Sequence, residues 1–167
     1  YTGRMQPGLV RISFVEFFDQ LHSQIDAMAE FKDLELVFSS SVSSGELMVD
    51  TKAMQQVFYN LIKNAGEAMT GKDRRCVSII ADRESDHFTI RVQDTGPGFQ
   101  CLPEHIFEPL FTTKAQGTGL GLVICQAIVD GHHGQIEARR IDDSITEFCI
   151  SLPITQSDND KTGEDHR

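Results

Sequence analysis

Three glycines at every second position, in Gly117-Thr118-Gly119-Leu120-Gly121-Leu122, could bind a phosphate group. Because glycine has no Cβ atom, the backbone amides of this run can approach an anion closely. An apolar stretch that is typical of a helix follows directly, and a helix N-terminus adds about half a positive charge. The run therefore predicts an anion-binding loop, although glycine-rich turns before helices are more often plain loops.

Two asparagines, Asn60 and Asn64, are one turn apart on a predicted helix and share one of its faces. They lie at the border of the apolar arc of that helix, neither central nor fully solvated. Their side-chain oxygens could coordinate Mg²⁺, a hard cation that also binds the phosphates of a substrate. On this segment alone, two polar residues on a helix flank are the simpler interpretation.

Asp94 ends a predicted strand and is followed by Thr95-Gly96-Pro97-Gly98. A carboxylate there can accept a hydrogen bond from the exocyclic amine of adenine, whereas guanine has a carbonyl at the equivalent atom. If buried, it would select ATP over GTP, because the wrong base would leave it unpaired. The same residue types also form ordinary turns, which is the alternative for this segment in isolation.

The segment Phe107-Glu108-Pro109-Leu110-Phe111-Thr112-Thr113-Lys114 connects the loop after Asp94 to the glycine run. Its two phenylalanines are four residues apart with a proline between them, and we expect them to anchor the base of a lid. Lys114 is the only lysine or arginine between Arg91 and Arg139. A phosphate partner is the natural role for this cation, and a solvated surface lysine is the alternative.

Capping signals and apolar periodicity predict the elements that must position these motifs. Ser13 and Glu16 form a capping box, and Asp50 is a predicted N-cap. We expect helices over residues 13–30, 51–69 and 119–130, with a short helix near 103–107. We expect strands over 9–12, 34–38, 47–49, 77–81, 88–92, 136–139 and 145–152, with turns at 83–86 and 142–144 and loops at 39–45 and 94–99.

This order of elements favours an α+β fold, a two-layer sandwich in which about three helices pack on one face of a mixed, largely antiparallel sheet. The length of 167 residues suits one domain. We expect residues 1–12 to be a linker from a preceding domain, residues 13–154 to form the domain, and the polar residues 155–167 to be disordered.

The net charge of −10 argues against nucleic-acid binding, which requires a basic face, but it is compatible with a single nucleotide. No apolar run is long enough to cross a membrane and no signal peptide is recognisable, so we expect a cytoplasmic domain without direct membrane contact. The cysteines show no metal-binding spacing and resemble core residues. Cys76 and Cys149 could form a disulfide only if their strands were neighbours.

The order of the four motifs resembles the N, G1, F and G2 boxes of bacterial sensor histidine kinases. The boxes correspond to Asn60-Leu-Ile-Lys-Asn64-Ala, Asp94-Thr-Gly-Pro-Gly98, Phe107-Glu-Pro-Leu-Phe111 and the glycine run. These kinases share an ATPase superfamily with gyrase, heat-shock chaperones and mismatch-repair proteins. The resemblance covers residues 9–153 and implies a Bergerat-type ATP-binding fold. Phe-Thr-Thr-Lys and Asn-Ala-Gly-Glu-Ala-Met are most similar to the nitrogen-regulator class.

The resemblance implies a role for each matching residue. Asn64 would coordinate Mg²⁺, and Asn60 would support the metal and the phosphates. In relatives that hydrolyse ATP a glutamate activates water at the position of Asn60, and an amide cannot act as that base. Asp94 would bind the adenine amine. The other expected nucleotide contacts are Gly96, Gly98, Phe107, Phe111, Thr113, Lys114, Gly117, Thr118, Gly119, Leu120 and Gly121.

The sequence departs from the family pattern at two places. Many membrane-bound relatives carry a basic residue at the position of Glu67, and Lys114 could supply the missing charge. The phosphorylated histidine of the family, normally within His-Glu and followed closely by a proline, has no counterpart among the six histidines. We therefore expect a catalytic domain that transfers phosphate from Mg-ATP to a histidine on a separate dimerisation domain.

The implied partners are that dimerisation domain, missing here, and a response-regulator receiver domain. The isolated chain would be a monomer, the parent protein a homodimer, and membrane anchoring of the parent is left open. Two alternatives stay open. A non-catalytic ATP-binding docking module would have the same boxes, and Asp94-Thr95-Gly96 is also the triplet of aspartic proteases, which would require a dimer.

Overall fold

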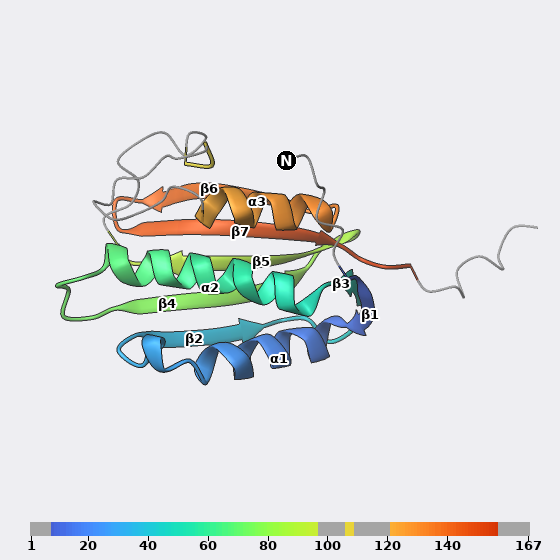
Figure 1. The fold of residues 1–167 in the computed structure, drawn as a ribbon, viewed down its shortest axis with the longest axis horizontal. Coiled ribbons are helices and arrows are strands. Elements are labelled where there is room, and N and C mark those ends of the chain that lie inside the picture. The colour runs from blue at the N-terminus through green and yellow to red at the C-terminus, as the bar shows by residue number, and fades with distance from the viewer. Residues whose placement is uncertain (1–7, 97–105, 109–120, 157–167) are drawn as a thin grey trace, which may run out of the picture.

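Three helices lie on one face of a five-stranded sheet in the computed structural model, which describes residues 8–96, 106–108 and 121–156 (Figure 1). The helices are α1 (Phe14–Asp26), α2 (Thr51–Ala68) and α3 (Gly121–Gly131). The sheet has the order β2-β4-β5-β7-β6, formed by β2 (Glu35–Ser40), β4 (Cys76–Arg83), β5 (His87–Asp94), β7 (Ile145–Pro153) and β6 (Gln135–Asp142).

The predicted α+β fold with a mixed, largely antiparallel sheet is confirmed. β2 pairs with β4 in parallel, and the three other strand pairs of the sheet are antiparallel. In Figure 1, α3 lies over β6 and β7, and α2 lies over β4 and β5. A separate two-stranded sheet joins β1 (Val10–Ser13) to β3 (Glu46–Val49), and a short 3-10 helix, η1 (Ala29–Phe31), follows α1.

The two long helices begin where their caps predict. The Ser13 hydroxyl accepts a hydrogen bond from the Glu16 backbone N–H at 3.1 Å, and the Asp50 carboxylate accepts one from the Ala53 N–H at 3.0 Å. Each cap satisfies a donor that the first helical turn leaves unpaired. The apolar stripes predicted for both helices are buried against the sheet.

The core lies between the helices and one face of the sheet. In β4 and β5 buried residues alternate with half-buried ones, so one face of each strand points toward the helices. Phe14 of α1 stacks on Phe88 of β5 with ring centroids 4.3 Å apart, and both side chains are fully buried. Burying an aromatic side chain of this kind contributes about 1.5–3 kcal/mol to folding, so this pair holds α1 on the sheet.

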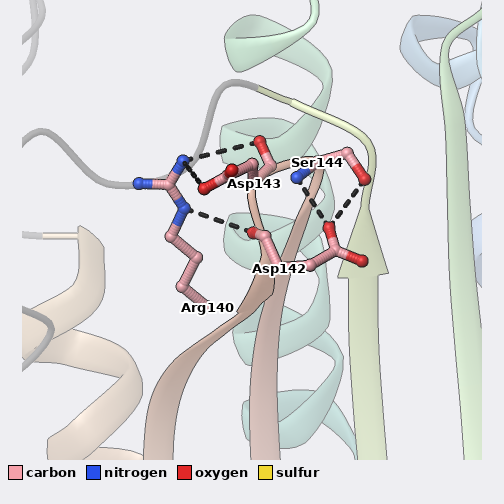
Figure 2. A network of polar contacts seen from close by, with 4 residues as sticks. All are labelled: Arg140, Asp142, Asp143 and Ser144. Atoms are coloured by element: carbon pink, nitrogen blue, oxygen red, sulfur yellow. Dashed lines mark hydrogen bonds and ion pairs between the residues drawn. The ribbon is translucent and has the colours of Figure 1, made fainter.

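The hairpin between β6 and β7 turns at the predicted residues (Figure 2). The Asp142 carboxylate accepts hydrogen bonds from the backbone N–H and the hydroxyl of Ser144, both at 2.7 Å. Arg140 Nε donates to the Asp142 carbonyl at 3.2 Å. The Ser144 hydroxyl is the largest of the causes that lower the pKa of Asp142. The turn fixes where β7 begins and therefore which residues of β7 face β5.

Some predicted boundaries are wrong. α1 ends at Asp26 rather than near residue 30, because Met28 adopts an extended backbone that lets Phe31 turn back into the core. β2 continues to Ser40, into the predicted loop, where it pairs with Ala81. Thr155, placed in the expected disordered tail, pairs with Glu46.

Cys76 and Cys149 do not form a disulfide. Cys76 begins β4 and Cys149 lies in β7, and β5 separates the two strands. The three cysteines of the described chain are free thiols. The expected short helix near residues 103–107 lies mostly outside the described residues, although Ile106 and Phe107 are in a turn.

His132 connects the end of α3 to the start of α2 and is only 2% exposed. Its Nε2 accepts a hydrogen bond from the Asp50 backbone N–H at 2.9 Å, so its Nδ1 carries the proton and donates to the Ile128 carbonyl at 2.7 Å. The Asp50 carboxylate also accepts from the Gly8 N–H at 2.9 Å. Asp50 and His132 together thus join the incoming chain, α2 and α3.

Replacing His132 by phenylalanine should destabilise the domain. A phenyl ring would fill the space of the imidazole but would leave the part-buried Asp50 N–H without its acceptor. We therefore expect the free energy of unfolding to fall by about 1–3 kcal/mol. Urea unfolding followed by circular dichroism measures this change.

The control is His133→Asn. His133 is exposed and has a φ of 58°, a conformation that asparagine tolerates. This variant should change the free energy of unfolding by less than about 0.5 kcal/mol. Equal stability of the two variants would show that the His132 hydrogen bonds contribute little.

Candidate functional site

Three chain segments that carry or adjoin the predicted motifs lie at the same end of the sheet, together with the start of β7, which carries none of them. The end of α2, the end of β5, the start of β7 and the start of α3 all lie at the left of Figure 1. Asp94 is the last residue of β5, as predicted, and its side chain is only 6% exposed. The structure therefore places a buried carboxylate where these segments converge.

The hydrogen bonding of Asp94 leaves part of its carboxylate available. Oδ1 accepts a bond from the Gly96 backbone N–H at 2.8 Å, and Oδ2 accepts none from the described residues. Burial raises the pKa of Asp94, while the Gly96 N–H and the nearby positive charge of Lys72 lower it. A buried carboxylate with one open oxygen suits the recognition of a hydrogen-bond donor on a ligand.

Gly96 is required for this arrangement. A Cβ atom at residue 96 would lie 2.7 Å from Asp94 Oδ1 and 3.3 Å from the Ala68 Cβ. No side chain fits there unless the carboxylate moves. The prediction that Gly96 shapes a pocket beside Asp94 remains a prediction, but the crowding explains why a glycine follows the carboxylate at this spacing.

Thr146 is a candidate site residue that the sequence prediction missed. It lies directly opposite Asp94 in the pairing of β5 with β7 and is 4% exposed. Its hydroxyl is buried and has no hydrogen-bond partner among the described residues. A signal was present in the sequence, because Thr146 is the one polar residue on the inward face of β7, in line with Phe148, Ile150 and Leu152.

A buried hydroxyl without a partner normally costs about 1–3 kcal/mol. Asp94 and Thr146 together present an acceptor and a donor–acceptor side by side on two paired strands. This pair can form hydrogen bonds with the edge of a planar polar ligand. The orphaned hydroxyl is therefore the observation that indicates a ligand at this place rather than a simple turn.

Asn60 and Asn64 lie on α2 and are both half-buried, as predicted for the border of its apolar arc. A Cβ atom placed on Gly121, the first residue of α3, would lie 4.0 Å from Asn60 Cγ. The structure thus brings the last glycine of the run next to the first asparagine. Asn64 follows one turn later, and its oxygen is of a type that binds Mg²⁺.

α3 is packed against α2 through Cys125, which is fully buried. Its thiol donates to the Val57 carbonyl at 3.7 Å. Burial raises the pKa of Cys125 to about 11, although a hydrogen bond with the Asn60 side chain lowers it. The thiol is therefore protonated at neutral pH and acts as a packing residue, as the sequence predicted.

Phe107 is anchored on the sheet. Its ring meets the ring of Phe148 in β7 edge-on, with centroids 6.2 Å apart. This contact is consistent with an anchoring role at the base of the connecting segment. The predicted site residues outside the described residues are Gly98, Phe111, Thr113, Lys114, Gly117, Thr118, Gly119 and Leu120.

Glu67 is exposed on α2 and lines a cavity of about 200 Å³ together with Lys63 and Arg75.

Within the part of the chain that the structure describes, no group of three or more histidine, cysteine, aspartate and glutamate side chains could hold a metal ion. No described helix is long and apolar enough to cross a membrane.

A family of histidine kinase-, DNA gyrase B- and HSP90-like ATPases matches residues 49–156. The sensor histidine kinase ZraS of Escherichia coli O157:H7 is 32% identical over 136 residues, which are 81% of this chain and 29% of ZraS. The sensor protein FixL of Bradyrhizobium diazoefficiens is 34% identical over 130 residues, 76% of this chain and 26% of FixL. The chain thus spans less than a third of these relatives.

The fold matches solved catalytic domains of histidine kinases. A nucleotide-free form of the ThkA catalytic domain has a TM-score of 0.72 and 27% identity, over 87% of this chain and 95% of that domain. ThkA in complex with the response regulator TrrA has a TM-score of 0.71 and 24% identity, over 88% of this chain and 42% of ThkA. The second comparison supports the fold alone.

Replacing Asp94 by asparagine should stabilise the free domain at pH 7. The folded chain raises the pKa of this carboxyl above its ordinary value of 3.8, so ionisation destabilises the fold. Asparagine keeps an acceptor for the Gly96 N–H and carries no charge. The gain in free energy of unfolding should become smaller as the pH falls through the raised pKa of Asp94. It should vanish below 3.8, where this carboxyl is protonated in both the folded and the unfolded chain.

Urea unfolding at several pH values measures this difference. Asp86→Asn is the control, because Asp86 is exposed and its hydrogen bond to His87 lowers its pKa. That substitution should not stabilise the domain at pH 7. An Asp94→Asn variant that is less stable than the unmodified chain at pH 7 would contradict the prediction.

Proposed function

Because the chain belongs to the family of histidine kinase-, DNA gyrase B- and HSP90-like ATPases, we propose that it is the ATP-binding catalytic domain of a two-component sensor histidine kinase. In this proposal it binds Mg-ATP and transfers the γ-phosphoryl group to a histidine on a separate dimerisation domain. The observation that carries the proposal is the Asp94–Thr146 pair, a buried carboxylate beside an orphaned hydroxyl at the end of β5.

The pair accounts for selection of adenine. Asp94 Oδ2 accepts a hydrogen bond from the exocyclic amine, and the Thr146 hydroxyl pairs with a ring nitrogen directly or through water. Guanine presents a carbonyl to the carboxylate, so two acceptors would face each other in a site with little water. A mismatch of this kind is a strong basis for discrimination, because it leaves buried polar groups unpaired.

The remaining residues act on the phosphates. Bound Mg-ATP supplies the γ-phosphoryl group, and Mg²⁺ neutralises part of its charge. Asn64 offers an oxygen ligand to the metal, and Asn60 supports this region from beside the start of α3. The backbone amides of Gly117, Gly119 and Gly121 and the side chain of Lys114 stabilise the phosphates. Phosphoryl transfer needs alignment and charge neutralisation rather than covalent help from the protein.

The acceptor and the partners lie outside this chain in the proposal. None of its six histidines has the sequence context of the acceptor, so the imidazole comes from a dimerisation domain, and a response regulator then receives the phosphoryl group. The solved complex of ThkA with a response regulator is consistent with such a partner. We further propose that the domain lies in the cytoplasm. From Phe-Thr-Thr-Lys and Asn-Ala-Gly-Glu-Ala-Met, we propose that the parent protein belongs to the nitrogen-regulator class of these kinases.

Transfer in trans tests the proposal. The chain is mixed with radiolabelled ATP, Mg²⁺ and a separately made dimerisation domain that carries the acceptor histidine. We expect label on that domain alone, in an acid-labile form, and neither self-labelling nor rapid hydrolysis by this chain. Asn64→Ala should lower transfer by at least about 10- to 100-fold, since loss of a metal ligand should cost no less than loss of a residue that only supports one.

Gln56→Ala is the matched control, an exposed amide earlier on α2. It should leave transfer unchanged. Binding of ATP without any transfer would favour the non-catalytic docking module, and absence of ATP binding would refute the proposal. The family match already argues against the aspartic protease, whose catalysis needs two carboxylates that share a proton.

Lys114→Ala tests whether this lysine replaces the basic residue that many relatives have at the position of Glu67. We expect ATP affinity and transfer rate to fall by roughly 10- to 100-fold, as for the loss of one charge-assisted hydrogen bond of about 1.5–3 kcal/mol. Lys52→Ala, at an exposed position on α2, is the control. Unchanged affinity and transfer in Lys114→Ala would show that Lys114 does not contact the phosphates.

A further inference from the structure

Lys72 links the connection after α2 to the end of β5. Its ammonium group donates a hydrogen bond to the Thr95 carbonyl at 2.6 Å, across 23 residues of sequence. Gly71 has a φ of +85°, which reverses the chain direction after α2. The turn is closed by a hydrogen bond from the Lys72 N–H to the Met69 carbonyl at 3.0 Å. The lysine is thus aimed at the residue that follows Asp94.

Two further contacts hold the same few residues. The Thr95 hydroxyl donates to Met69 Sδ at 3.4 Å, and the Gly96 N–H donates to Asp94 Oδ1 at 2.8 Å. The position of the carboxylate therefore depends on the backbone at residues 95 and 96. That backbone is in turn held by residues of the segment after α2, through the bond from Lys72 to the Thr95 carbonyl and the bond from Thr95 to Met69.

Lys72 also supplies charge. Burial raises the pKa of Asp94, and the positive charge of Lys72 opposes that rise. The residues that pair with Asp94 across the sheet, Thr146 in β7 and Val77 in β4, are uncharged. Ala68 and Met69, which lie beside Gly96 at the end of α2, are uncharged as well. Among the described residues, Lys72 is the cation that acts on this carboxylate.

We propose that Lys72 is a positioning residue of the base-binding site, which holds the Thr95 carbonyl and thereby keeps the Asp94 carboxylate in place as the acceptor for adenine. The inference rests on the function proposed above. Lys72 does not contact the nucleotide in this account. It acts through the backbone of Thr95 and through the charge on Asp94, so its effect concerns the base and not the phosphates.

The experiment compares three variants by calorimetric titration with ATP and with adenosine, from pH 8 down to the lowest pH at which the chain stays folded. Lys72→Gln removes the charge, Lys72→Arg keeps it, and Lys32→Gln is the control. Lys32 is matched, because it also donates to a backbone carbonyl, that of Asp26 at 3.1 Å, on an exposed surface away from the site. Circular dichroism checks that each variant is folded.

We expect Lys72→Gln to weaken ATP binding by roughly three- to tenfold at pH 7, the effect of one lost hydrogen bond. Adenosine should lose the same factor, because it presents the same base without phosphates. Loss of the positive charge raises the pKa of Asp94 further, so the decline of affinity at acid pH should begin at a higher pH. Lys72→Arg should restore the affinity and the pH profile, and Lys32→Gln should match the unmodified chain.

Three results would overturn the inference. They are unchanged affinity in Lys72→Gln, a loss seen with ATP but not with adenosine, and a loss of equal size at every pH. The second would make Lys72 a phosphate contact, and the third would reduce it to support of the fold. Failure of the proposed function looks different, because the unmodified chain would then bind neither ligand.

Discussion

The burial of the Asp94 carboxylate at the end of β5 is the constraint on which the site depends. A carboxylate in this position is costly, and the fold lowers that cost only in part, through the Gly96 N–H and the charge of Lys72. The orphaned Thr146 hydroxyl beside it adds a second unfavourable group. In the proposed function, adenine completes the hydrogen bonds of both groups, so its binding relieves the free-energy cost that the empty site imposes on the fold.

The rest of the fold positions the two helices, α2 and α3, that carry the other predicted site residues. α2 carries the asparagines and α3 begins at the last glycine of the run, so the distance between these helices sets the width of the proposed phosphate region. Cys125 packs the helices together near the site, and the hydrogen bond from the Asp50 N–H to His132 holds them at the far end. The same Asp50 binds the chain at Gly8, so the segment that leads into β1 is tied to the N-terminus of the helix that carries the asparagines.

Local rules of sequence predicted most of the fold. The caps at Ser13 and Asp50, the apolar stripes of α1 and α2 and the turn at Asp142 depend on residues close together in the chain, and all three were predicted from them. The errors arose where long-range packing overrides local preference. α1 ends early because Phe31 is drawn into the core, and β2 runs into a serine-rich segment because β4 offers it partners.

The sequence by itself determined the family, since four motifs in a fixed order indicate an ATPase of this kind, and it singled out Asp94 and Asn64 as candidate site residues. Only the tertiary structure decided which residues stand beside them. Thr146 faces Asp94 through the register of β5 and β7, Lys72 reaches Thr95 across 23 residues, and Gly121 meets Asn60 because α3 packs on α2. These neighbours are set by strand register and helix packing, which are collective properties of the folded chain. A local pattern such as the inward polar position of Thr146 can mark a candidate residue but not its partner.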